Sequence, residues 1–517
     1  MGNFGILAGK EYAMDNGFVY FVGAGPGRAD LITVRGVEVF KKADCIIYDK
    51  LANPALLKYA RADTEIIHVP KRIGDASVTQ HQINRLLVEK ASGGRTVVRL
   101  KGGDPCIFGR ITEEVAALSE AGIDFEIVPG ITAGIAVSAY TGIMLTDRKY
   151  SSQVIFITGR EAEGKKDSNI DWSLLAKFPG TIVFYMGMGN LGSIAEKLIK
   201  NGMSQNTPAV VVTEVTFPSQ RMIRGHLAGI SKTCEKSEIG PPAIIIIGAA
   251  ADSDINLDWF TKLPLFGRNI VVTRDAAGNT DFAEKIVTHG GNPVQFETFR
   301  LISLTETNDF MRAMSGFSGY DWIVFTSGNG VTVFFEALEK LGKDARVFAS
   351  AKIAAIGGRT AEKLSLYGIK ADFVPSVFTS EEFGKQLLNF TNLRDKKVLL
   401  LRSKIASNEL VELLGKGGAT VNDVAIYTAV TQKNETDWFL KKIGRNEINW
   451  LTFASPSAVD GFLEQIDAEM IRQGGVKIAS IGPVTTRELE SHGICVDVTA
   501  DEYTLDGLLA AIEQTYR

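Results

Sequence analysis

A buried strand that ends in a glycine-rich turn is the feature of this sequence that most restricts its fold. Residues 95–100 have the apolar and β-branched composition of a strand, and the sequence Gly-Gly-Asp-Pro follows at 102–105. Glycines let the main chain approach a ligand closely, because no side chain intervenes. In open α/β sheets, ligands bind at the carboxyl ends of the strands. Gly102, Gly103 and Asp104 are therefore predicted to lie at a binding edge.

Four further apolar segments in the first half have strand character. They lie at 18–23, 45–48, 65–70 and 125–128, and helix-like segments at 80–91 and 111–121 alternate with them. This alternation predicts a mainly parallel sheet whose functional groups gather at one edge. Asp49 and Lys71 each follow a strand, as Asp104 does. The predicted edge thus combines two acids and a base.

The first strand runs into the sequence Gly-Ala-Gly-Pro-Gly at 23–27. A dinucleotide-binding turn has the pattern G-x-G-x-x-G and leads directly into a helix. Here Pro26 and Arg28 stand where that helix would begin. The sequence therefore predicts no nicotinamide or flavin site at this turn.

Charge and cysteine usage narrow the ligand and the compartment. Between residues 71 and 110, eight lysines or arginines stand against three acidic residues, although the whole chain has a formal net charge of −4. This local basic excess suits a polyanionic ligand, and a solvated basic face is the alternative. The four cysteines are far apart, and no apolar run approaches the ~18 residues of a membrane span. These features predict a cytosolic protein without a zinc cluster.

Several motifs of the first half together resemble uroporphyrinogen-III C-methyltransferase, which belongs to the S-adenosylmethionine-dependent tetrapyrrole methylases. The resemblance covers about 18–250 and implies two α/β subdomains with the cofactor in the cleft between them, usually as a homodimer. The motifs are Gly-Ala-Gly-Pro-Gly at 23–27, Tyr-Asp at 48–49, Lys-Arg at 71–72, Arg-Leu-Lys-Gly-Gly-Asp-Pro at 99–105, Phe-Gly-Arg at 108–110, Val-Pro-Gly-Ile-Thr-Ala at 128–133, Leu-Thr-Asp-Arg at 145–148 and Phe-Tyr-Met-Gly at 184–187.

This resemblance also implies residue roles. Asp49 matches the family's proton acceptor and Lys71 its proton donor. Methylation of a pyrrole carbon leaves a cationic ring that must lose a proton, and a positioned carboxylate can accept it. The arginines implied to bind the carboxylates of uroporphyrinogen are Arg72, Arg110 and Arg148. The residues implied to bind S-adenosylmethionine are Pro26, Gly102, Gly103, Asp104, Ile107, Thr132, Ala133, Met186, Val215 and Ala243.

Two positions depart from the family pattern. Val215 stands where the family has glycine, in the sequence Thr-Glu-Val-Thr at 213–216. Valine has a narrower φ preference than glycine, but a main-chain contact tolerates it, so we expect activity to be retained; the effect of Val215 on donor affinity stays open. Pro70 replaces a second glycine just before Lys71 and stiffens the approach to that lysine.

The second half contains an internal repeat. Ile-Val-Val-Thr-Arg at 270–274 corresponds to Val-Leu-Leu-Leu-Arg at 398–402, and Phe-Thr-Ser at 325–327 corresponds to Phe-Ala-Ser at 453–455, both with an offset of 128. A third pair ends at Thr360 and Thr485, with an offset of 125. Each segment is an apolar strand that ends in hydroxyl residues or glycine at a helix start, where backbone N–H groups favour anions. Two such lobes predict a clamp around an anionic ligand.

The repeat resembles uroporphyrinogen-III synthase over about 265–517. The resemblance implies that the chain crosses twice between lobes, so that lobe one spans 267–300 plus 432–517 and lobe two spans 301–431. Tyr427 matches a tyrosine proposed as the general acid for loss of the bilane hydroxyl, and a partly buried hinge aromatic is the alternative. The residues implied to bind substrate carboxylates are Arg274, Thr326, Ser327, Thr360, Arg402, Ser455 and Thr485.

The sequence as a whole predicts an α/β protein with a flexible tail at 1–16, a tetrapyrrole methylase domain at 17–252, a linker at 253–266 and a synthase domain at 267–517. Its predicted function is to cyclise hydroxymethylbilane to uroporphyrinogen III, with inversion of ring D, and then to transfer two methyl groups, which gives precorrin-2. Two alternatives remain: a methylase of a later corrin intermediate, and a methyltransferase fused to a non-catalytic tetrapyrrole-binding module. No metal, nucleic acid or membrane is expected as a partner.

Overall fold

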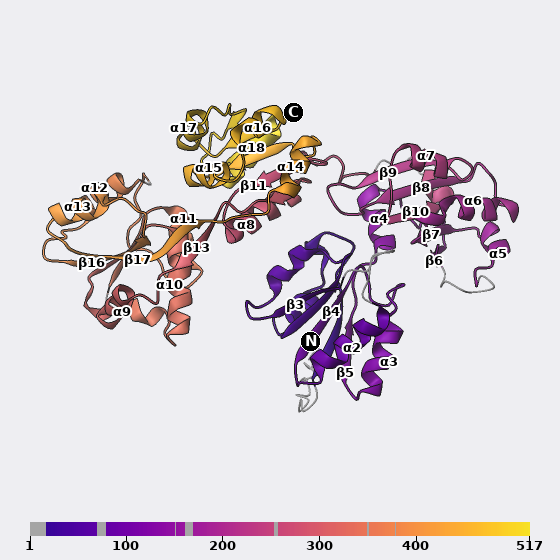
Figure 1. The fold of residues 1–517 in the computed structure, drawn as a ribbon, viewed down its shortest axis with the longest axis horizontal. Coiled ribbons are helices and arrows are strands. Elements are labelled where there is room, and N and C mark those ends of the chain that lie inside the picture. The colour runs from indigo at the N-terminus through magenta and orange to yellow at the C-terminus, as the bar shows by residue number, and fades with distance from the viewer. Residues whose placement is uncertain are drawn as a thin grey trace. The chain divides into compact units, whose positions relative to one another are not determined.

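The computed structural model describes residues 17–69, 79–149, 151–160, 169–252, 257–348, 351–377 and 379–516. These residues form two compact units. The first contains the described residues up to Arg268 together with Val287–Asn292, and the second contains Asn269–Ile286 together with the described residues from Pro293 onward. Among the described residues, each unit holds two five-stranded sheets, whose elements are labelled in Figure 1. The tail predicted at 1–16 lies outside the described residues.

The first sheet is parallel throughout and has the strand order β3-β2-β4-β1-β5. Side chains of β4 alternate between its two faces: Val97 packs with Leu87 and Leu118, whereas Val98 packs with Phe40 on the opposite face. Helices thus cover both faces, as the predicted parallel sheet requires. The elements are β1 (Phe18–Gly23), β2 (Cys45–Asp49), β3 (Glu65–Val69), β4 (Thr96–Lys101), β5 (Asp124–Val128), α1 (Val34–Phe40), α2 (Gln80–Ala91) and α3 (Ile111–Glu120).

Threonine caps begin two of these helices. Thr33 Oγ1 accepts a hydrogen bond from the Gly36 N–H at 3.2 Å. Thr79 and Gln82 form a reciprocal capping box, in which each side chain accepts from the backbone N–H of the other residue. The helix predicted at 80–91 is confirmed with the same bounds, and the helix predicted at 111–121 ends one residue earlier.

The second sheet of the first unit is mixed, with the order β6-β7-β10-β8-β9. Only β6 and β7 pair in parallel, and the remaining neighbours are antiparallel. Sequence analysis did not predict this arrangement, because β8 and β9 form a hairpin without an intervening helix. The elements are β6 (Val154–Thr158), β7 (Thr181–Tyr185), β8 (Pro208–Thr213), β9 (Arg221–His226), β10 (Ala243–Ile247), α4 (Ala133–Thr141), α5 (Trp172–Ala176), α6 (Leu191–Lys200) and α7 (Ile230–Lys236).

The second unit contains one sheet of order β12-β11-β18-β19-β20 and one of order β13-β17-β16-β14-β15. Most neighbours pair in parallel, and β13 pairs antiparallel with the long strand β17. The strands are β11 (Asn269–Val272), β12 (Asn292–Gln295), β13 (Phe299–Ser303), β14 (Trp322–Phe325), β15 (Lys352–Ala355), β16 (Lys397–Ser403), β17 (Thr420–Thr431), β18 (Trp450–Phe453), β19 (Lys477–Ser480) and β20 (Val498–Thr499). The helices are α8 (Ala276–Thr288), α9 (Asn308–Ser315), α10 (Gly328–Lys340), α11 (Gly358–Ser365), α12 (Ser380–Phe390), α13 (Glu409–Lys416), α14 (Asp437–Gly444), α15 (Pro456–Leu463), α16 (Ala468–Gln473), α17 (Pro483–Ser491) and α18 (Leu505–Gln514).

The predicted internal repeat is present in both sheets of the second unit. Strand β14 leads to α10 through Ser327, and β18 leads to α15 through Ser455. Both serines cap their helices by accepting from a backbone N–H three residues later, at 3.0 Å for Ser327 and 3.2 Å for Ser455. The offset of 128 in the sequence therefore corresponds to the same strand–cap–helix unit formed twice.

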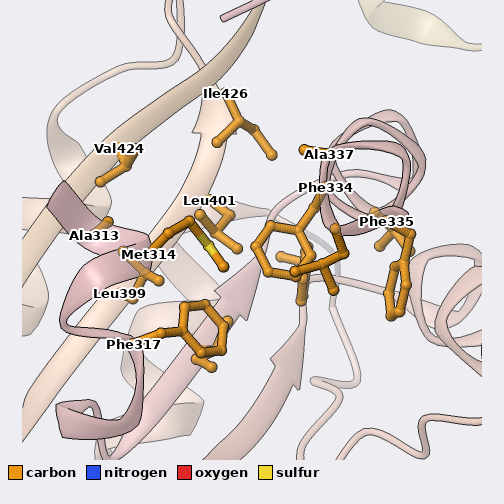
Figure 2. Close-up of a cluster of buried hydrophobic side chains, with 14 of the residues drawn as sticks. Ala313, Met314, Phe317, Phe334, Phe335, Ala337, Leu399, Leu401, Val424 and Ile426 are labelled. Carbon is orange, nitrogen blue, oxygen red and sulfur yellow. The ribbon is translucent and has the colours of Figure 1, made fainter. Parts of the chain in front are cut away.

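The core of this unit follows the two-residue period of its strands. On β16, Leu399 and Leu401 face a cluster that includes Phe334 of α10, and Figure 2 shows these side chains together. Val398 and Leu400, which alternate with them, pack on the other face with residues of α12 and α13. Truncation of a fully buried aromatic such as Phe334 to alanine is expected to cost about 3–5 kcal/mol. Within the described part of the chain, no helix combines the length and apolar character needed to cross a bilayer.

Candidate functional sites

Three turns meet at the carboxyl edge of the first sheet. Gly25 and Gly103 exchange backbone hydrogen bonds of 3.2 and 2.8 Å, which join the turn after β1 to the turn after β4. Asp104 accepts from the Gly130 N–H with Oδ2 at 3.0 Å and from the Cys106 N–H with Oδ1 at 2.8 Å. The predicted aspartate thus fastens the turn after β5 to the other two.

Two glycines are required sterically at this edge. A Cβ on Gly23 would lie 2.6 Å from the Gly130 Cα, and one on Gly130 would lie 2.3 Å from the Gly103 carbonyl oxygen. No heavier residue fits without separating the strand ends. Glycine at these positions therefore lets the backbones of the three turns pack directly against one another.

The second sheet contributes the beginning of α4. The Tyr185 hydroxyl accepts from the Gly134 N–H at 2.8 Å and lies 2.9 Å from Thr132 Oγ1. Burial raises the pKa of Tyr185, so this hydroxyl stays neutral. Three predicted donor-site residues, Ile107, Ala133 and Val215, pack in or against one buried cluster with Tyr185. Ala243, at the start of β10, packs against a different buried cluster.

Strained backbone is concentrated around the same residues. Phe108, Arg110, Met186, Glu214 and Thr216 all have φ between 48° and 73°, a region that non-glycine residues seldom adopt. Positive φ at a β-branched residue such as Thr216 persists only where the surroundings enforce it, and such strain clusters at ligand sites. The Thr216 hydroxyl is buried and accepts from the Arg28 N–H at 3.0 Å.

Val215 itself is free of this strain. Its φ is not positive. Val215 is only 5% exposed and packs in the core beside the second sheet. The unusual conformations belong to its neighbours Glu214 and Thr216. The expected conflict between valine and a glycine-like φ therefore does not arise at position 215.

Asp49 ends β2 as the first member of a buried charge network. Its Oδ1 lies 2.6 Å from Nη2 of Arg99, whose side chain is completely buried. Glu114 of α3, also completely buried, accepts from Lys101 Nζ with both oxygens at 2.9 Å and lies 3.4 Å from Arg99. Burial and the neighbouring Arg99 lower the pKa of Lys101, and Glu114 opposes this shift. The network fixes Asp49 at the edge of the sheet.

Sequence analysis did not assign Arg99, Lys101 or Glu114 a role. A signal was present, because Arg99 and Lys101 lie two residues apart in an otherwise apolar strand and so share one face. Two cations on a helix-covered face require a buried acid, which α3 supplies. Of the remaining predicted residues, Lys71 and Arg72 lie outside the described residues, Arg110 pairs with Glu113 at 2.8 Å, and Arg148 is exposed.

In the second unit the structure brings Tyr427 and Ser327 together. Their hydroxyl oxygens are 2.9 Å apart, and Tyr427 is 8% exposed. Burial raises the pKa of Tyr427, hydrogen bonds from Ser327 and Ser403 lower it, and the negative charge of Asp275 raises it. Tyr427 is therefore a neutral hydroxyl at physiological pH and can donate a proton or a hydrogen bond.

The other predicted residues of this unit differ in accessibility. Thr360 and Thr485 lie near the starts of α11 and α17 and are almost fully buried, whereas Thr326 and Ser455 are partly exposed. Arg402 is buried and makes a bidentate pair with Asp423. The Arg402 guanidinium is thus already paired with a carboxylate of the protein itself. Arg274 lies beside the first turn of α8.

One cluster bears on the expectation that no metal is bound. The side chains of Asp460, Glu488 and His492 place one potential ligand atom each within 4.8 Å of one another. All three are partly exposed, and His492 Nε2 lies 3.4 Å from Glu488 and 3.9 Å from Asp460. The contacts of the His492 imidazole with the two carboxylates account for this proximity.

The two units together define a class of enzyme that acts on tetrapyrroles. Residues 19–231 match the family model of tetrapyrrole (corrin/porphyrin) methylases, and residues 280–510 match that of uroporphyrinogen-III synthase HemD. The chain is 34% identical over 496 residues to the porphyrin biosynthesis protein HemD of Ruminiclostridium josui, which covers 96% of this chain and 97% of that protein. It belongs to this family of methylase–synthase fusions.

Two further relatives carry the methyltransferase name. Uroporphyrinogen-III C-methyltransferase of Bacillus subtilis (strain 168) is 39% identical over 355 residues, which is 69% of this chain and 72% of that protein. The crystal structure of uroporphyrin-III C-methyl transferase from Thermus thermophilus in complex with S-adenyl homocysteine is 34% identical and covers 45% of this chain and 98% of that chain, with a TM-score of 0.40. The chain is therefore a bifunctional enzyme of tetrapyrrole biosynthesis, a uroporphyrinogen-III C-methyltransferase and a uroporphyrinogen-III synthase.

Proposed function

We propose that the two units catalyse consecutive reactions, with the product of the second unit as the substrate of the first. The second unit closes hydroxymethylbilane to uroporphyrinogen III with inversion of ring D. The first unit then transfers two methyl groups from S-adenosylmethionine and releases precorrin-2. No metal takes part in either reaction, and the enzyme acts in the cytosol as a homodimer formed through the first unit.

The anchored carboxylate of Asp49 is the observation that carries the methyltransferase assignment. It stands at the carboxyl end of β2, paired at 2.6 Å with the buried Arg99. The methylated pyrrole ring is cationic and must lose a proton to regain a neutral macrocycle, and a fixed carboxylate at this edge can accept that proton. Lys71 is the proton donor that the sequence predicts for the same edge.

The glycine-lined edge supports the position of the methyl donor. Gly102 and Gly103 are partly exposed beside Asp104, and Ile107 and Ala133 supply an apolar wall against the buried cluster around Val215. S-adenosylmethionine is a zwitterionic sulfonium with a flat adenine, so it needs both polar main-chain groups and an apolar wall. These residues hold and orient the donor, and a closed apolar surface around them keeps water from the transferring methyl group.

In the second unit, Tyr427 supplies the proton for loss of the bilane hydroxyl. Its neutral, buried hydroxyl and its contact with Ser327 support this role. The helix starts capped by Ser327 and Ser455 offer N–H groups to the substrate carboxylates. Cyclisation then depends chiefly on holding the bilane in a curled geometry.

The test uses the purified full chain with hydroxymethylbilane, with and without S-adenosylmethionine, followed by chromatographic separation of ring isomers and methylated products. Type III ring without the donor and a dimethylated product with it are expected. Formation of only the type I ring, which arises spontaneously, would show that the second unit is a binding module without synthase activity.

An Asp49→Asn variant tests the proton acceptor separately. Methylation is expected to fall by about 10²–10⁴-fold, because one general base is lost, while cyclisation continues and uroporphyrinogen III accumulates. Asp63→Asn, which removes an exposed partner of Arg61, is the matched control. Calorimetric titration with S-adenosylmethionine should give the same affinity for all three proteins, and a lost affinity in Asp49→Asn would move Asp49 from proton transfer to donor binding.

A further inference from the structure

An unsatisfied polar pair is buried at the beginning of α8. Asp275, immediately before the helix, is 6% exposed, and Asn279 in its first turn is fully buried. Asp275 Oδ1 and Asn279 Nδ2 have no hydrogen-bond partner among the residues that the structure describes. A buried polar group without a partner costs about 1–3 kcal/mol, so a pair of them calls for a ligand or for an explanation in function.

The orientation of both side chains is determined by their surroundings. Asn279 Oδ1 accepts from the Arg274 N–H at 2.7 Å, which leaves the amide NH₂ as the free donor. The Arg274 guanidinium and Asp275 Oδ1 both lie against Gly278, where an added Cβ would be 2.8 Å from each of them. An acceptor, a donor and a cation therefore converge on one turn of α8.

This turn belongs to the same unit as Tyr427, and the charge of Asp275 acts on the Tyr427 hydroxyl. The negative charge of Asp275 contributes to the raised pKa of Tyr427, after the larger effect of burial. Asp275 is thus a buried charge in the same unit as the predicted acid.

The substrate of the synthase reaction matches this arrangement chemically. Hydroxymethylbilane presents pyrrole N–H donors and side-chain carboxylates. Loss of its hydroxyl breaks a C–O bond, and the oxygen leaves as water with a proton from Tyr427. The remaining azafulvenium carries one positive charge, shared with a pyrrole nitrogen. Ring D first forms a C–C bond to this cation, and inversion then breaks the C–C bond between ring D and its original bridge carbon, which regenerates a cation there. A second C–C bond closes the ring and releases one proton, which returns to Tyr427.

We propose that Asp275 is a further catalytic residue of the synthase unit. Its carboxylate accepts a pyrrole N–H of the bilane and stabilises the azafulvenium cation, while the Asn279 amide donates to a neighbouring substrate carboxylate. This assignment rests on the proposed synthase reaction. A preorganised charge aimed at the developing cation acts strongly in a buried site, because little water screens it.

The test compares Asp275→Asn with the wild-type full chain in steady-state formation of uroporphyrinogen III. Loss of the charge is expected to lower kcat on the order of a hundredfold with little change in KM. Asn279→Ala is expected to raise KM about tenfold, the effect of one lost hydrogen bond. Asp281→Asn, an exposed position on the same helix, is the matched control and should behave as wild type.

Chemical unfolding distinguishes a catalytic from a structural role. A buried carboxylate with an unpartnered oxygen opposes folding, so Asp275→Asn should unfold at the same or a higher urea concentration than wild type. A variant that loses activity and stability together would overturn the proposal, as would one that keeps kcat within twofold. Absence of the type III ring from the wild-type reaction would overturn the synthase function itself, and with it this assignment.

Discussion

The two units bury charge in opposite ways. In the first unit, Glu114 is surrounded by Arg99 and Lys101, and every charge of the cluster has a partner. In the second unit, Asp275 is almost as deeply buried, yet one carboxylate oxygen has no partner among the described residues. A satisfied network stabilises the fold and positions Asp49, whereas an unsatisfied acid reduces stability. The difference indicates that burial alone does not assign a role; the presence of a partner does.

Removal of the central acid of the first network is expected to have the largest effect. Glu114→Gln leaves the buried Lys101 without its negative partner and leaves Arg99 paired with Asp49 alone, which should cost about 3–5 kcal/mol of unfolding free energy. Urea unfolding, with hydrogen exchange measured on peptides from β4, checks this value. Glu113→Gln is the control, because its partner Arg110 is exposed and can be hydrated. Equal losses in the two variants would contradict a network that depends on burial.

A substitution of Val215, an apolar residue at the predicted methyl-donor site, measures the contribution of packing to stability without changing any charge. Val215→Gly removes a side chain from the buried cluster of the second sheet and adds backbone freedom, so a loss of about 2–3 kcal/mol is expected. Thermal unfolding measures the loss, and titration with S-adenosylmethionine measures donor affinity. Tighter donor binding in the glycine variant would show that valine at this position weakens the binding of S-adenosylmethionine.

The ion pair of Arg402 with Asp423 in the second unit tests whether the loss of a partner or the degree of burial decides how much stability is lost. Arg402→Met leaves Asp423 without its bidentate partner, and the expected loss is about 1–3 kcal/mol, because the Asp423 side chain is one-third exposed and regains water. Arg312→Met, at an exposed pair, is the control. A raised KM for hydroxymethylbilane with unchanged stability would instead support the predicted role of Arg402 in substrate binding.

The smallest effect concerns the alkaline limit of stability. The pKa of Tyr427 lies above its ordinary value of 10.0, so the folded state holds this proton more tightly than the unfolded state. The resulting stabilisation is fully present below pH 10 and is lost as pH rises from there through the folded-state pKa. Urea unfolding at pH 8 and at about pH 10.5 should show a steeper loss for wild type than for Tyr427→Phe. Identical slopes would contradict the raised pKa.

The sequence predicted the elements and the strand ends more fully than it predicted their contacts. The turn at 102–105, the helix Gln80–Ala91 and the repeat with an offset of 128 all follow from local patterns of two or 3.6 residues. The hairpin of β8 and β9 was missed, because an antiparallel pair needs no helix and leaves no alternation of elements. The roles of the predicted site residues remain predictions that the variants above test.

Partners across long sequence separations were beyond sequence reasoning. Asp49 and Arg99 are 50 residues apart, and no local sequence pattern around either residue indicates that the other is its partner. The strain expected at Val215 falls on its neighbours, because the core accepts the valine side chain and the turn then bends at Glu214 and Thr216.

The sequence by itself determined which residues end strands, which begin helices and which enzyme families the chain resembles, because these depend on local composition and spacing. Only the tertiary structure decided which buried charges are paired. How helices pack on the sheets decides that Glu114 contacts Arg99 and Lys101, and that one oxygen of Asp275 has no partner among the described residues. Electrostatic energy depends on distance and burial and not on position along the chain.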